Sequence, residues 1–290
     1  MHKTPLVSIV IPCYNAEKFV GETISSVLRQ TFQSFEIIII DDGCTDDSVA
    51  VISMIQDPRI IFLRKENTGV SDCRNIGMSL SQGEFILFLD ADDILSSDFI
   101  EKRVDYLRIH KNLGFCFSSV LKIDDAGKEI PGNKVDGAGA DLLMELLTYN
   151  LNFVSCPSNY LFRKDVLETY SVRFNTQLSS SADRFFLIEL SRFSMGGKID
   201  SNGHLLYRVH QKSMSNFLTQ TLIDDNYRFQ NKVLKLEYIP KNLKKIFRYK
   251  TNFILAGSYY KLKKHAPFAA FLLKAFADNP IGIMQKLFKG

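Results

Sequence analysis

The sequence lacks several features, and each absence argues against a class of protein. Its five cysteines are an odd number, widely spaced and without a CxxC pair, which argues against a disulfide framework and indicates reduced thiols in a cytosolic protein. The N-terminal segment MHKTPLVSIVIP holds only a short apolar run, so we expect no secretory signal. No uncharged run in residues 240–290 reaches the roughly 18 to 20 residues that span a bilayer.

Length and composition describe an ordinary globular protein with an uneven charge distribution. The chain has 290 residues, 46% hydrophobic and 23% charged, which suits one large α/β domain with or without a smaller attachment. Residues 240–290 hold 11 Lys and Arg against one acid, a net charge of +10. The remaining 25 basic and 31 acidic residues give residues 1–239 a net charge of −6. The basic character therefore belongs to the C-terminal stretch.

Strand and helix patterns alternate in the first third of the chain. Apolar runs predict buried strands at residues 7–11, 35–40, 60–63 and 85–89, the first of them ended by Pro12. Helical spacing predicts helices at 17–30, at 46–55 with Thr45 as N-cap, and at 71–81. This alternation predicts an α/β fold with a doubly wound, mostly parallel sheet.

The pattern is looser after residue 93. We expect helices at 98–110, 140–147 and 182–193, and strands at 115–123, 158–162 and 205–209. The segment DDAGKE, residues 124–129, predicts a hairpin turn.

The stretch EFILFLDADD ends a buried strand in carboxylates. Its apolar run is typical of a central parallel strand, and Asp90, Asp92 and Asp93 follow without a basic neighbour. Three carboxylates beside an apolar floor repel one another unless a cation neutralises them, as a divalent metal with a phosphorylated ligand would. Ligands of open α/β sheets lie at this edge. The alternative is a helix N-terminus, because Asp residues cap helices.

Six motifs together resemble a known family. In chain order they are VSIVIPCYN, IIIIDDGCTDDS, NTGVSDCRNIG, GEFILFLDADD, the Asp of SADRFF, and HQKSMS. Their order over residues 5–216 resembles the family 2 glycosyltransferases, which implies the GT-A fold with its Rossmann-like sheet. The resemblance also implies transfer of a sugar from a nucleotide diphosphate, usually UDP, to an acceptor hydroxyl.

The resemblance assigns the donor's base and ribose to the first two strand ends. Pro12 and Tyr14 match positions that line the base pocket, where an aromatic ring stacks on a flat base; a core or turn tyrosine is the alternative. Asn15 and Glu17 share this turn, and Glu17 is assigned to the base or the ribose. Asp42 matches the acid that accepts a hydrogen bond from the uracil N–H.

The resemblance assigns the diphosphate and its metal to later motifs. Arg74 and Asn75, at the start of a helix, suit a phosphate or the acidic cluster, and a surface arginine is the alternative. The other assignments are the ribose for Asp90, the nucleotide sugar for Ala91, Mn²⁺ or Mg²⁺ for Asp92, and a supporting place for Asp93.

His210 opens the last motif, HQKSMS. The resemblance implies that this segment closes over the diphosphate and that His210 binds the metal or a phosphate. Lys212, Ser213 and Ser215 would add phosphate contacts. The alternative for His210 is a surface loop histidine that titrates near neutrality.

Asp183 matches the family's catalytic carboxylate. This group removes the proton from the acceptor hydroxyl as the oxygen attacks the anomeric carbon, so that one displacement inverts that centre. The sequence departs from the family here, because Ala182 stands where Glu is usual. The alternative is that Asp183 serves as N-cap of the helix at 182–193.

The C-terminal stretch, residues 217–290, lies outside the resemblance. Lysines alternate with apolar residues there, which predicts basic amphipathic helices that lie on an anionic membrane surface. A helical subdomain packed on the catalytic core, or a homodimer interface, is the alternative. We expect no nucleic acid partner, because no recognisable module accompanies the basic residues.

These observations define the expected protein. We expect a catalytic domain at 1–216, with a nucleotide-binding half at 1–110 and an acceptor-binding half at 111–216, followed by the helical extension. The expected activity is inverting, metal-dependent transfer of a hexose or N-acetylhexosamine from a UDP-sugar to a saccharide or lipid-linked acceptor of a bacterial cell-surface polysaccharide. The expected location is cytoplasmic or peripheral at the inner face of the plasma membrane.

Two other classes of protein compete with this expectation. A nucleotidyltransferase would need a Gly-rich phosphate loop with a lysine near the first strand, and the segment PCYNAE offers none. A catalytically decayed nucleotide-sugar-binding or membrane-scaffold protein is the other alternative, and Ala182 is the residue that motivates it.

Overall fold

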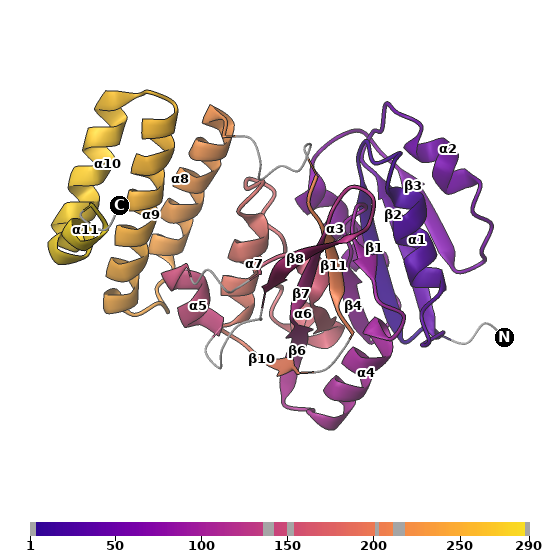
Figure 1. Ribbon diagram of the computed structural model, residues 1–290. Coiled ribbons are helices and arrows are strands. Elements are labelled where there is room, and N and C mark those ends of the chain that lie inside the picture. Colours follow the sequence, from indigo (N-terminus) through magenta and orange to yellow (C-terminus); the bar gives the residue numbers. More distant parts are fainter. Residues whose placement is uncertain (1–3, 136–141, 150–153, 201–202, 211–217, 288–290) are drawn as a thin grey trace.

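Seven strands form the central sheet of the computed structural model, which describes residues 4–135, 142–149, 154–200, 203–210 and 218–287 (Figure 1). In spatial order they are β10 (Met195–Ile199), β6 (Leu113–Ser118), β9 (Leu161–Arg163), β4 (Phe85–Phe88), β1 (Val7–Cys13), β2 (Phe35–Asp41) and β3 (Ile60–Arg64). Neighbouring strands pair in parallel, except that β9 runs antiparallel to both β4 and β6. The predicted mostly parallel α/β sheet is confirmed.

Helices cover both faces of this sheet, because successive strand residues point to opposite sides. Val7, Ile9 and Ile11 of β1 pack on one side, in a cluster that includes α1 (Val20–Leu28), α2 (Ser48–Ser53) and α4 (Phe99–Ile109). Val10 belongs to the cluster on the other side, with α3 (Val70–Leu80), α5 (Leu142–Thr148), α6 (Lys164–Thr169) and α7 (Ala182–Leu190). Burial on both faces explains the continuous apolar runs of these strands.

Two expected boundaries are wrong. β1 continues through Pro12 to Cys13, because β4 pairs with β1 only as far as Val10 and the last residues of β1 pair with β2 alone. Thr45 does not cap α2, which begins after Asp47 without a side-chain cap. Both the backbone N–H and the hydroxyl of Thr45 instead donate to Asn15 Oδ1, at 2.9 and 3.3 Å.

The expected strand at 115–123 is in fact two strands in different sheets. β6 ends at Ser118, and β7 (Val120–Ile123) belongs to a second sheet in the order β5 (Ile94–Leu95), β11 (Leu205–Arg208), β7 and β8 (Glu129–Val135). Both segments are largely buried, so the apolar pattern runs across the break without a signal. β7 and β8 form the predicted hairpin.

The second sheet positions two functional segments. β5 begins one residue after the acidic cluster at 90–93, and β11 ends two residues before His210. Because β5 and β11 are hydrogen-bonded neighbours, residues 90–93 and 208–210 meet although more than a hundred residues separate them in the chain.

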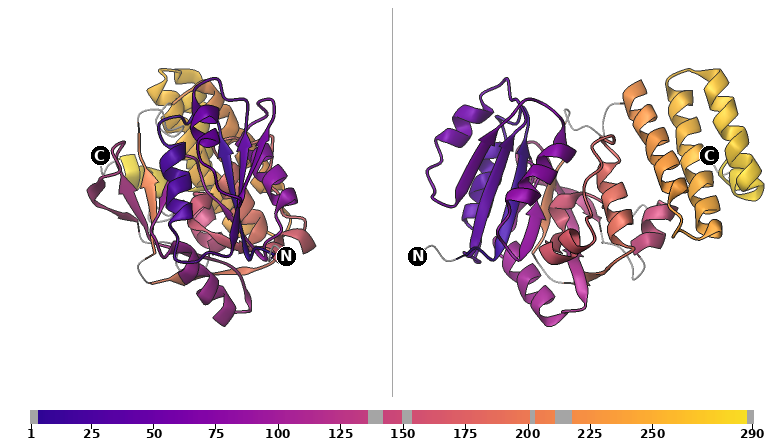
Figure 2. Two further views of the ribbon diagram at one scale, coloured as in Figure 1. Left: turned by 90° about the vertical axis from the view of Figure 1, so that its right-hand side faces the viewer. Right: turned by 180° about the vertical axis from the view of Figure 1, so that it is seen from behind.

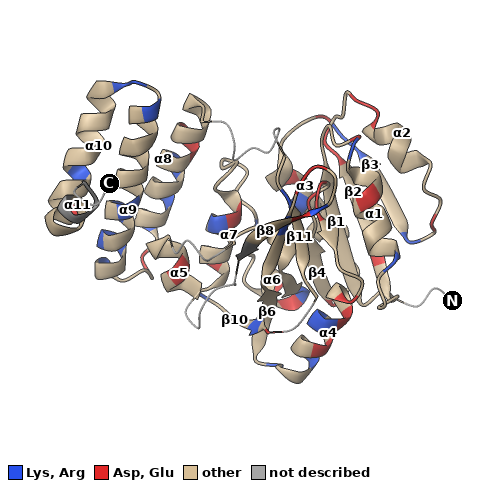
Figure 3. Cartoon of the chain, in the orientation of Figure 1, with Lys and Arg blue, Asp and Glu red and all other residues tan. Residues whose placement is uncertain are grey.

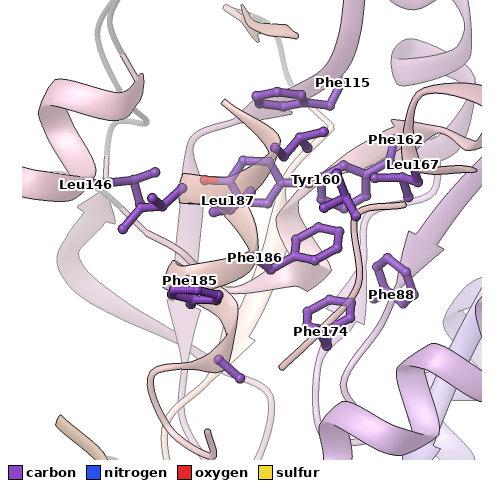
Figure 4. Close-up of a cluster of buried hydrophobic side chains, with 14 of the residues drawn as sticks. Phe88, Phe115, Leu146, Tyr160, Phe162, Leu167, Phe174, Phe185, Phe186 and Leu187 are labelled. Carbon is purple, nitrogen blue, oxygen red and sulfur yellow. The ribbon is translucent and has the colours of Figure 1, made fainter. Parts of the chain in front are cut away.

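A cluster of aromatic rings packs around Phe88 of β4 (Figure 4). Phe174 and Phe186 stack with ring centroids 4.1 Å apart, and Phe88 meets Phe174 edge-on at 4.9 Å. Each such pair contributes about 0.5–1.5 kcal/mol beyond the burial of its area. The guanidinium of Arg74 lies 5.1 Å from the Phe174 ring centroid, so this cluster also supports a charged group of the site.

The C-terminal helices stack at the end of the molecule remote from the N-terminus (Figures 1 and 2). They are α8 (Gln220–Lys235), α9 (Lys241–Lys261), α10 (His265–Asp278) and α11 (Pro280–Leu287). α8 and α9 extend the main core through Phe229, Val233 and Phe247. α10 and α11 join α9 in a small separate cluster. Among the described residues, no helix combines the length and apolarity needed to cross a membrane.

Candidate active site

A cavity of about 940 Å³ opens at the carboxyl ends of β1, β2 and β4. The turns after these strands form one wall, and the loops at 67–71 and 176–179 together with α8 form the other. The lining residues include Pro12, Tyr14, Asn15, Glu17, Asp42, Asp90, Ala91, Asp92, His210, Thr221, Asp225 and Arg228. The structure therefore brings together the residues predicted from four separate motifs.

The turn after β1 forms the rim of the cavity. Tyr14 is 54% exposed there, so its ring is available for stacking on a flat ligand. Asn15 has a φ of +50° and, through Oδ1, holds the turn before α2. Glu17 Oε2 accepts the N–H of Asp47 at 3.1 Å. Asn15 and Glu17 thus line the cavity and also join the turn after β1 to the turn after β2.

Asp42, at the end of β2, orders the opposite rim. Its Oδ1 accepts Lys65 Nζ at 2.5 Å and the Thr68 N–H at 2.9 Å, and its Oδ2 accepts the Gly69 N–H at 2.9 Å. Burial favours a higher pKa for Asp42, but these donors outweigh it and lower the pKa below its ordinary value. Asp42 is therefore ionised, and Oδ2, which takes one donor from the loop, has a second lone pair.

One arginine joins the acidic cluster to the start of α7. Arg74 is 2% exposed, and its guanidinium donates to Asp90 Oδ1 at 2.7 Å and to Asp183 Oδ1 at 2.6 Å. Burial alone would lower the pKa of Arg74, but Asp183 and then Asp90 raise it above its ordinary value. A permanently charged group thus fixes both carboxylates.

The side chain of Asp183 is partly exposed, and its pKa is raised. Its side chain is 24% exposed, in the first turn of α7, and the N-cap of that helix is Ser181. The expected alternative of Asp183 as N-cap is therefore wrong. Burial raises the pKa of Asp183 to about 6; Arg74 opposes this shift, and Asp90 adds to it. A carboxylate with this pKa exchanges its proton close to neutral pH.

Asp92 and His210 meet at the cavity wall. His210 Nε2 lies 2.9 Å from Asp92 Oδ2, and the imidazole ring packs 5.0 Å from the ring of Phe19. Arg208, two residues earlier, is 2% exposed and holds the turn: its Nε donates to the Asp92 backbone oxygen at 2.9 Å, and its N–H donates to Asp93 Oδ1 at 3.1 Å.

The acidic cluster carries more negative charge than its neighbours neutralise. Burial and the adjacent carboxylates raise the pKa of Asp92 and raise that of Asp93 well above the ordinary value. In Figure 3, acidic positions gather at these strand ends. Such a cluster favours a bound cation.

The donor atoms of the cluster suit a hard divalent metal ion. Carboxylate oxygens of Asp90 and Asp93 and the sulfur of Cys156 lie within 4.8 Å of one another. Burial and the nearby carboxylates raise the pKa of Cys156 well above its ordinary value, so the sulfur remains a thiol and is a poor ligand. The remaining donors, the carboxylate oxygens of Asp90 and Asp93, are of the kind that Mg²⁺ or Mn²⁺ prefers, and the neighbouring Asp92 is paired with His210.

Asp225 of α8 holds the loop that leads into α7. This carboxylate is 1% exposed and accepts four hydrogen bonds of 2.7–3.0 Å, from Ser179 N–H, Ser180 Oγ, and both the N–H and Oγ of Ser181. Sequence analysis missed Asp225, because α8 follows the last motif and gives no functional signal. It also missed Lys65 and Arg208, although both stand beside motif residues.

Asn75 lies away from the cavity. Its side-chain amide donates to the Phe174 backbone oxygen and accepts the Phe174 N–H, both at 2.9 Å. These bonds hold the segment whose ring supports Arg74, and Asn75 is not among the residues that line the cavity. Lys212, Ser213 and Ser215 lie outside the described residues.

Curated relatives carry the same type of domain. The family model for Glycosyl transferase family 2 matches residues 8–171, more than half of the chain. An uncharacterized glycosyltransferase of Haemophilus influenzae is 40% identical over 121 residues, which cover 39% of this chain and 48% of that protein. The chondroitin synthase of Escherichia coli is 34% identical over 132 residues, 45% of this chain and 19% of that protein. This chain thus spans about half, or less, of the length of these relatives.

Solved structures share the whole fold. S. aureus TarS 1–349 superposes with a TM-score of 0.70 at 16% identity, over 94% of this chain and 79% of that one. The mannosyltransferase PcManGT of Pyrobaculum calidifontis superposes with a TM-score of 0.63 at 16% identity, over 100% of this chain and 80% of that one. At such identities the likeness concerns the fold alone. With the family model and the site geometry, it leads to one conclusion: the chain belongs to family 2 of the glycosyltransferases and has the GT-A fold.

Proposed function

We propose that the protein transfers a hexose or N-acetylhexosamine from a UDP-sugar to a hydroxyl of a saccharide or lipid-linked saccharide, with inversion of the anomeric centre. The observation that carries this proposal is the pairing of Asp183, a carboxylate with a pKa of about 6, with Asp90 through the buried Arg74. Through Arg74, this pairing connects the proposed base to Asp90, which lines the cavity.

The nucleotide would occupy the cavity between the turns after β1 and β2. Tyr14 offers a ring face for the uracil, and the ionised carboxylate of Asp42, which lines the cavity, is an acceptor that suits the uracil ring N–H. Asp90 and Ala91, farther along the same wall, suit the ribose and the start of the diphosphate. Asn75 is left out of this proposal, because Phe174 occupies both polar atoms of its amide.

Asp183 would act as the general base of a single displacement. The acceptor oxygen forms a bond to the anomeric carbon while the bond from that carbon to the phosphate oxygen breaks and its electron pair leaves with UDP. The proton of the acceptor hydroxyl goes to Asp183. Arg74 holds Asp183 in place by a charged hydrogen bond, so the base needs no reorganisation as the reaction proceeds.

Asp92 and His210 would hold the divalent cation beside the diphosphate. When bound, such an ion neutralises the charge that develops on the leaving diphosphate. Burial, and then the nearby carboxylates, raise the pKa of Asp92 and Asp93, and a bound cation would favour their ionised forms. Arg208 holds the turn that contains Asp92 and Asp93 through its hydrogen bonds to the Asp92 backbone oxygen and to Asp93 Oδ1.

The neighbours support this class of donor. TarS has been solved with UDP and with UDP-GlcNAc, and PcManGT with GDP-Man and Mn²⁺. The relation to a chondroitin synthase supports a role in polysaccharide synthesis.

A donor screen tests the proposal. UDP-Glc, UDP-Gal, UDP-GlcNAc and UDP-GalNAc are offered with Mn²⁺, GDP-Man serves as the competing donor class, and release of the nucleoside diphosphate is measured. We expect release from at least one UDP-sugar and none without metal. Release from GDP-Man alone would contradict the UDP assignment. Tight UDP binding without turnover of any donor would favour the decayed binding protein.

The pH profile of kcat/KM should report the base. Asp183 acts only when deprotonated, so we expect kcat/KM to rise with pH, to bend near pH 6 and to level off above it. Below the bend the loss approaches tenfold per pH unit. The profile is measured by initial rates in a buffer of constant ionic strength, from about pH 5 to about pH 8, which extends about one unit below and two units above the pKa. A value of kcat/KM that stays constant over this range would contradict the assignment of Asp183 as the base.

Asp225→Asn should weaken both the fold and the reaction. Its new amide NH₂ faces N–H and hydroxyl groups that now donate to a carboxylate, so we expect a loss of about 3 kcal/mol in the free energy of unfolding. We also expect kcat to fall more than the donor KM changes, because the loop before Asp183 loosens. Asp224→Asn, at an exposed neighbouring position, is the control. Equal stability and kcat in both variants would remove Asp225 from the account.

A further inference from the structure

The outermost helices expose an apolar surface. The side chains of Ala266, Ala269, Ala270, Leu273, Phe276 and Ile281 are all exposed and form what we call the apolar stripe. Along α10 they recur every three or four residues, which places them on one face, and Ile281 is the second residue of α11, the helix that follows. Leu273 and Ile281 are each 69% exposed. A contiguous apolar helix face of this kind indicates a binding surface.

Basic residues stand on the same helices as the apolar stripe. Lys274 is exposed on α10, where its Nζ lies 4.8 Å from the Phe271 ring centroid, and exposed Lys261 and Lys263 precede the start of that helix. Asp278 is the single acid of residues 240–290, and Arg248 binds both its oxygens, at 2.8 and 2.5 Å. Figure 3 shows basic positions recurring along α9 and on α10. These helices thus combine the apolar stripe with basic residues, and their one carboxylate, Asp278, is neutralised by Arg248.

We propose that the apolar stripe with its flanking lysines docks this protein flat onto an anionic lipid surface. Charge selects this occupant: a second copy would bring two stretches of +10 together, whereas anionic headgroups attract each of them. Among the described helices none is long and apolar enough to span a bilayer, so the helices lie on the surface. The inference rests on the proposed function only for its purpose, which is to bring the enzyme to lipid-linked acceptors.

Vesicle flotation of the full chain, without donor or acceptor, tests the docking. We expect binding to phosphatidylcholine vesicles that contain about 30% phosphatidylglycerol, little binding to phosphatidylcholine alone, and weakening by added salt. Leu273→Asp with Ile281→Asp should weaken binding at least about tenfold. Met54→Asp with Ile109→Asp, at positions 74% and 76% exposed at the C-terminal ends of α2 and α4, is the matched control and should bind like the wild type.

Three results would overturn the docking proposal. They are the absence of binding to the anionic vesicles, equal loss in both double variants, and a dimer in light scattering that Leu273→Asp with Ile281→Asp converts to a monomer. The last result would assign the stripe to a second copy of the chain. Donor turnover is measured separately in solution and should be the same in all variants, so failure of the docking and failure of the proposed transferase activity are distinguishable.

Discussion

Asp183→Asn is expected to lower kcat by about 10²- to 10⁴-fold, the usual contribution of a general base. The substitution keeps the size of the side chain and one oxygen that can accept the bond from Arg74, but its amide cannot take up the acceptor's proton. The affinity for UDP should change little, because Asp183 lies beyond Arg74 and does not line the nucleotide cavity. The measurement is UDP release at saturating donor and acceptor, with UDP binding determined by calorimetry.

The control for this variant is Asp105→Asn, at an exposed position on α4. It should leave both kcat and UDP affinity unchanged. The limb of the pH profile near pH 6 should also disappear in Asp183→Asn, since the group that titrates there is gone. Undiminished turnover in Asp183→Asn would exclude Asp183 as the base.

Asp92→Asn is expected to reduce metal-dependent turnover on the order of 10²-fold or more, because it removes a charged oxygen at the proposed metal. In the metal-free protein, the same substitution should leave the thermal stability unchanged or raise it. The pKa of Asp92 is raised, so its ionised form costs folding free energy at every pH above its ordinary pKa, and the neutral amide removes that cost. We expect metal-free Asp92→Asn to melt no lower than the wild type at pH 8, about four units above the ordinary pKa of an Asp.

Thermal melting with and without Mn²⁺ separates the two effects. Mn²⁺ should raise the Tm of the wild type, as any ligand of the folded state does, and should raise that of Asp92→Asn much less. Asp98→Asn, which breaks a surface ion pair with Lys102, serves as the control and should retain the full response to Mn²⁺. An equal rise in Tm in all three proteins would place the ion elsewhere.

The sequence was sufficient for the fold of residues 1–110 because the signals there are local. Buried parallel strands are continuous apolar runs; β2 ends at Asp41, next to Asp42, and residues 90–93 follow the end of β4 after one residue. Carboxyl ends of parallel strands share one edge of a sheet, so the encounter of Asp42 with Asp90 at one cavity follows from the topology alone.

The second half was less predictable because its contacts join distant segments. Nothing in the local pattern separates β6 from β7, since both are apolar and the chain changes sheets at one residue, Ser119. β10 was missed because its sequence, MGGKI, lacks an apolar run; Gly196 and Gly197 are required where Phe115 and Tyr106 leave no space for a Cβ atom.

The site contains two contacts of the same long-range kind. Arg74 and Asp183 are 109 residues apart, and Asp225 holds the loop before α7 from a helix that follows every motif. No periodicity in the sequence encodes such pairs; they arise when α7 and α8 pack against the core of the sheet. The expected boundary at residue 216 therefore divides residues that line one cavity.

The central claim is that this cavity binds a UDP-sugar with a divalent cation for attack by a hydroxyl that Asp183 deprotonates. A crystal structure of the protein with UDP and Mn²⁺ tests it most directly. The account predicts uracil on the ring of Tyr14 with its N–H at Asp42, and the diphosphate with its ion against Asp92 and His210. UDP bound outside this cavity, or bound within it with its diphosphate remote from Asp92, would contradict the account.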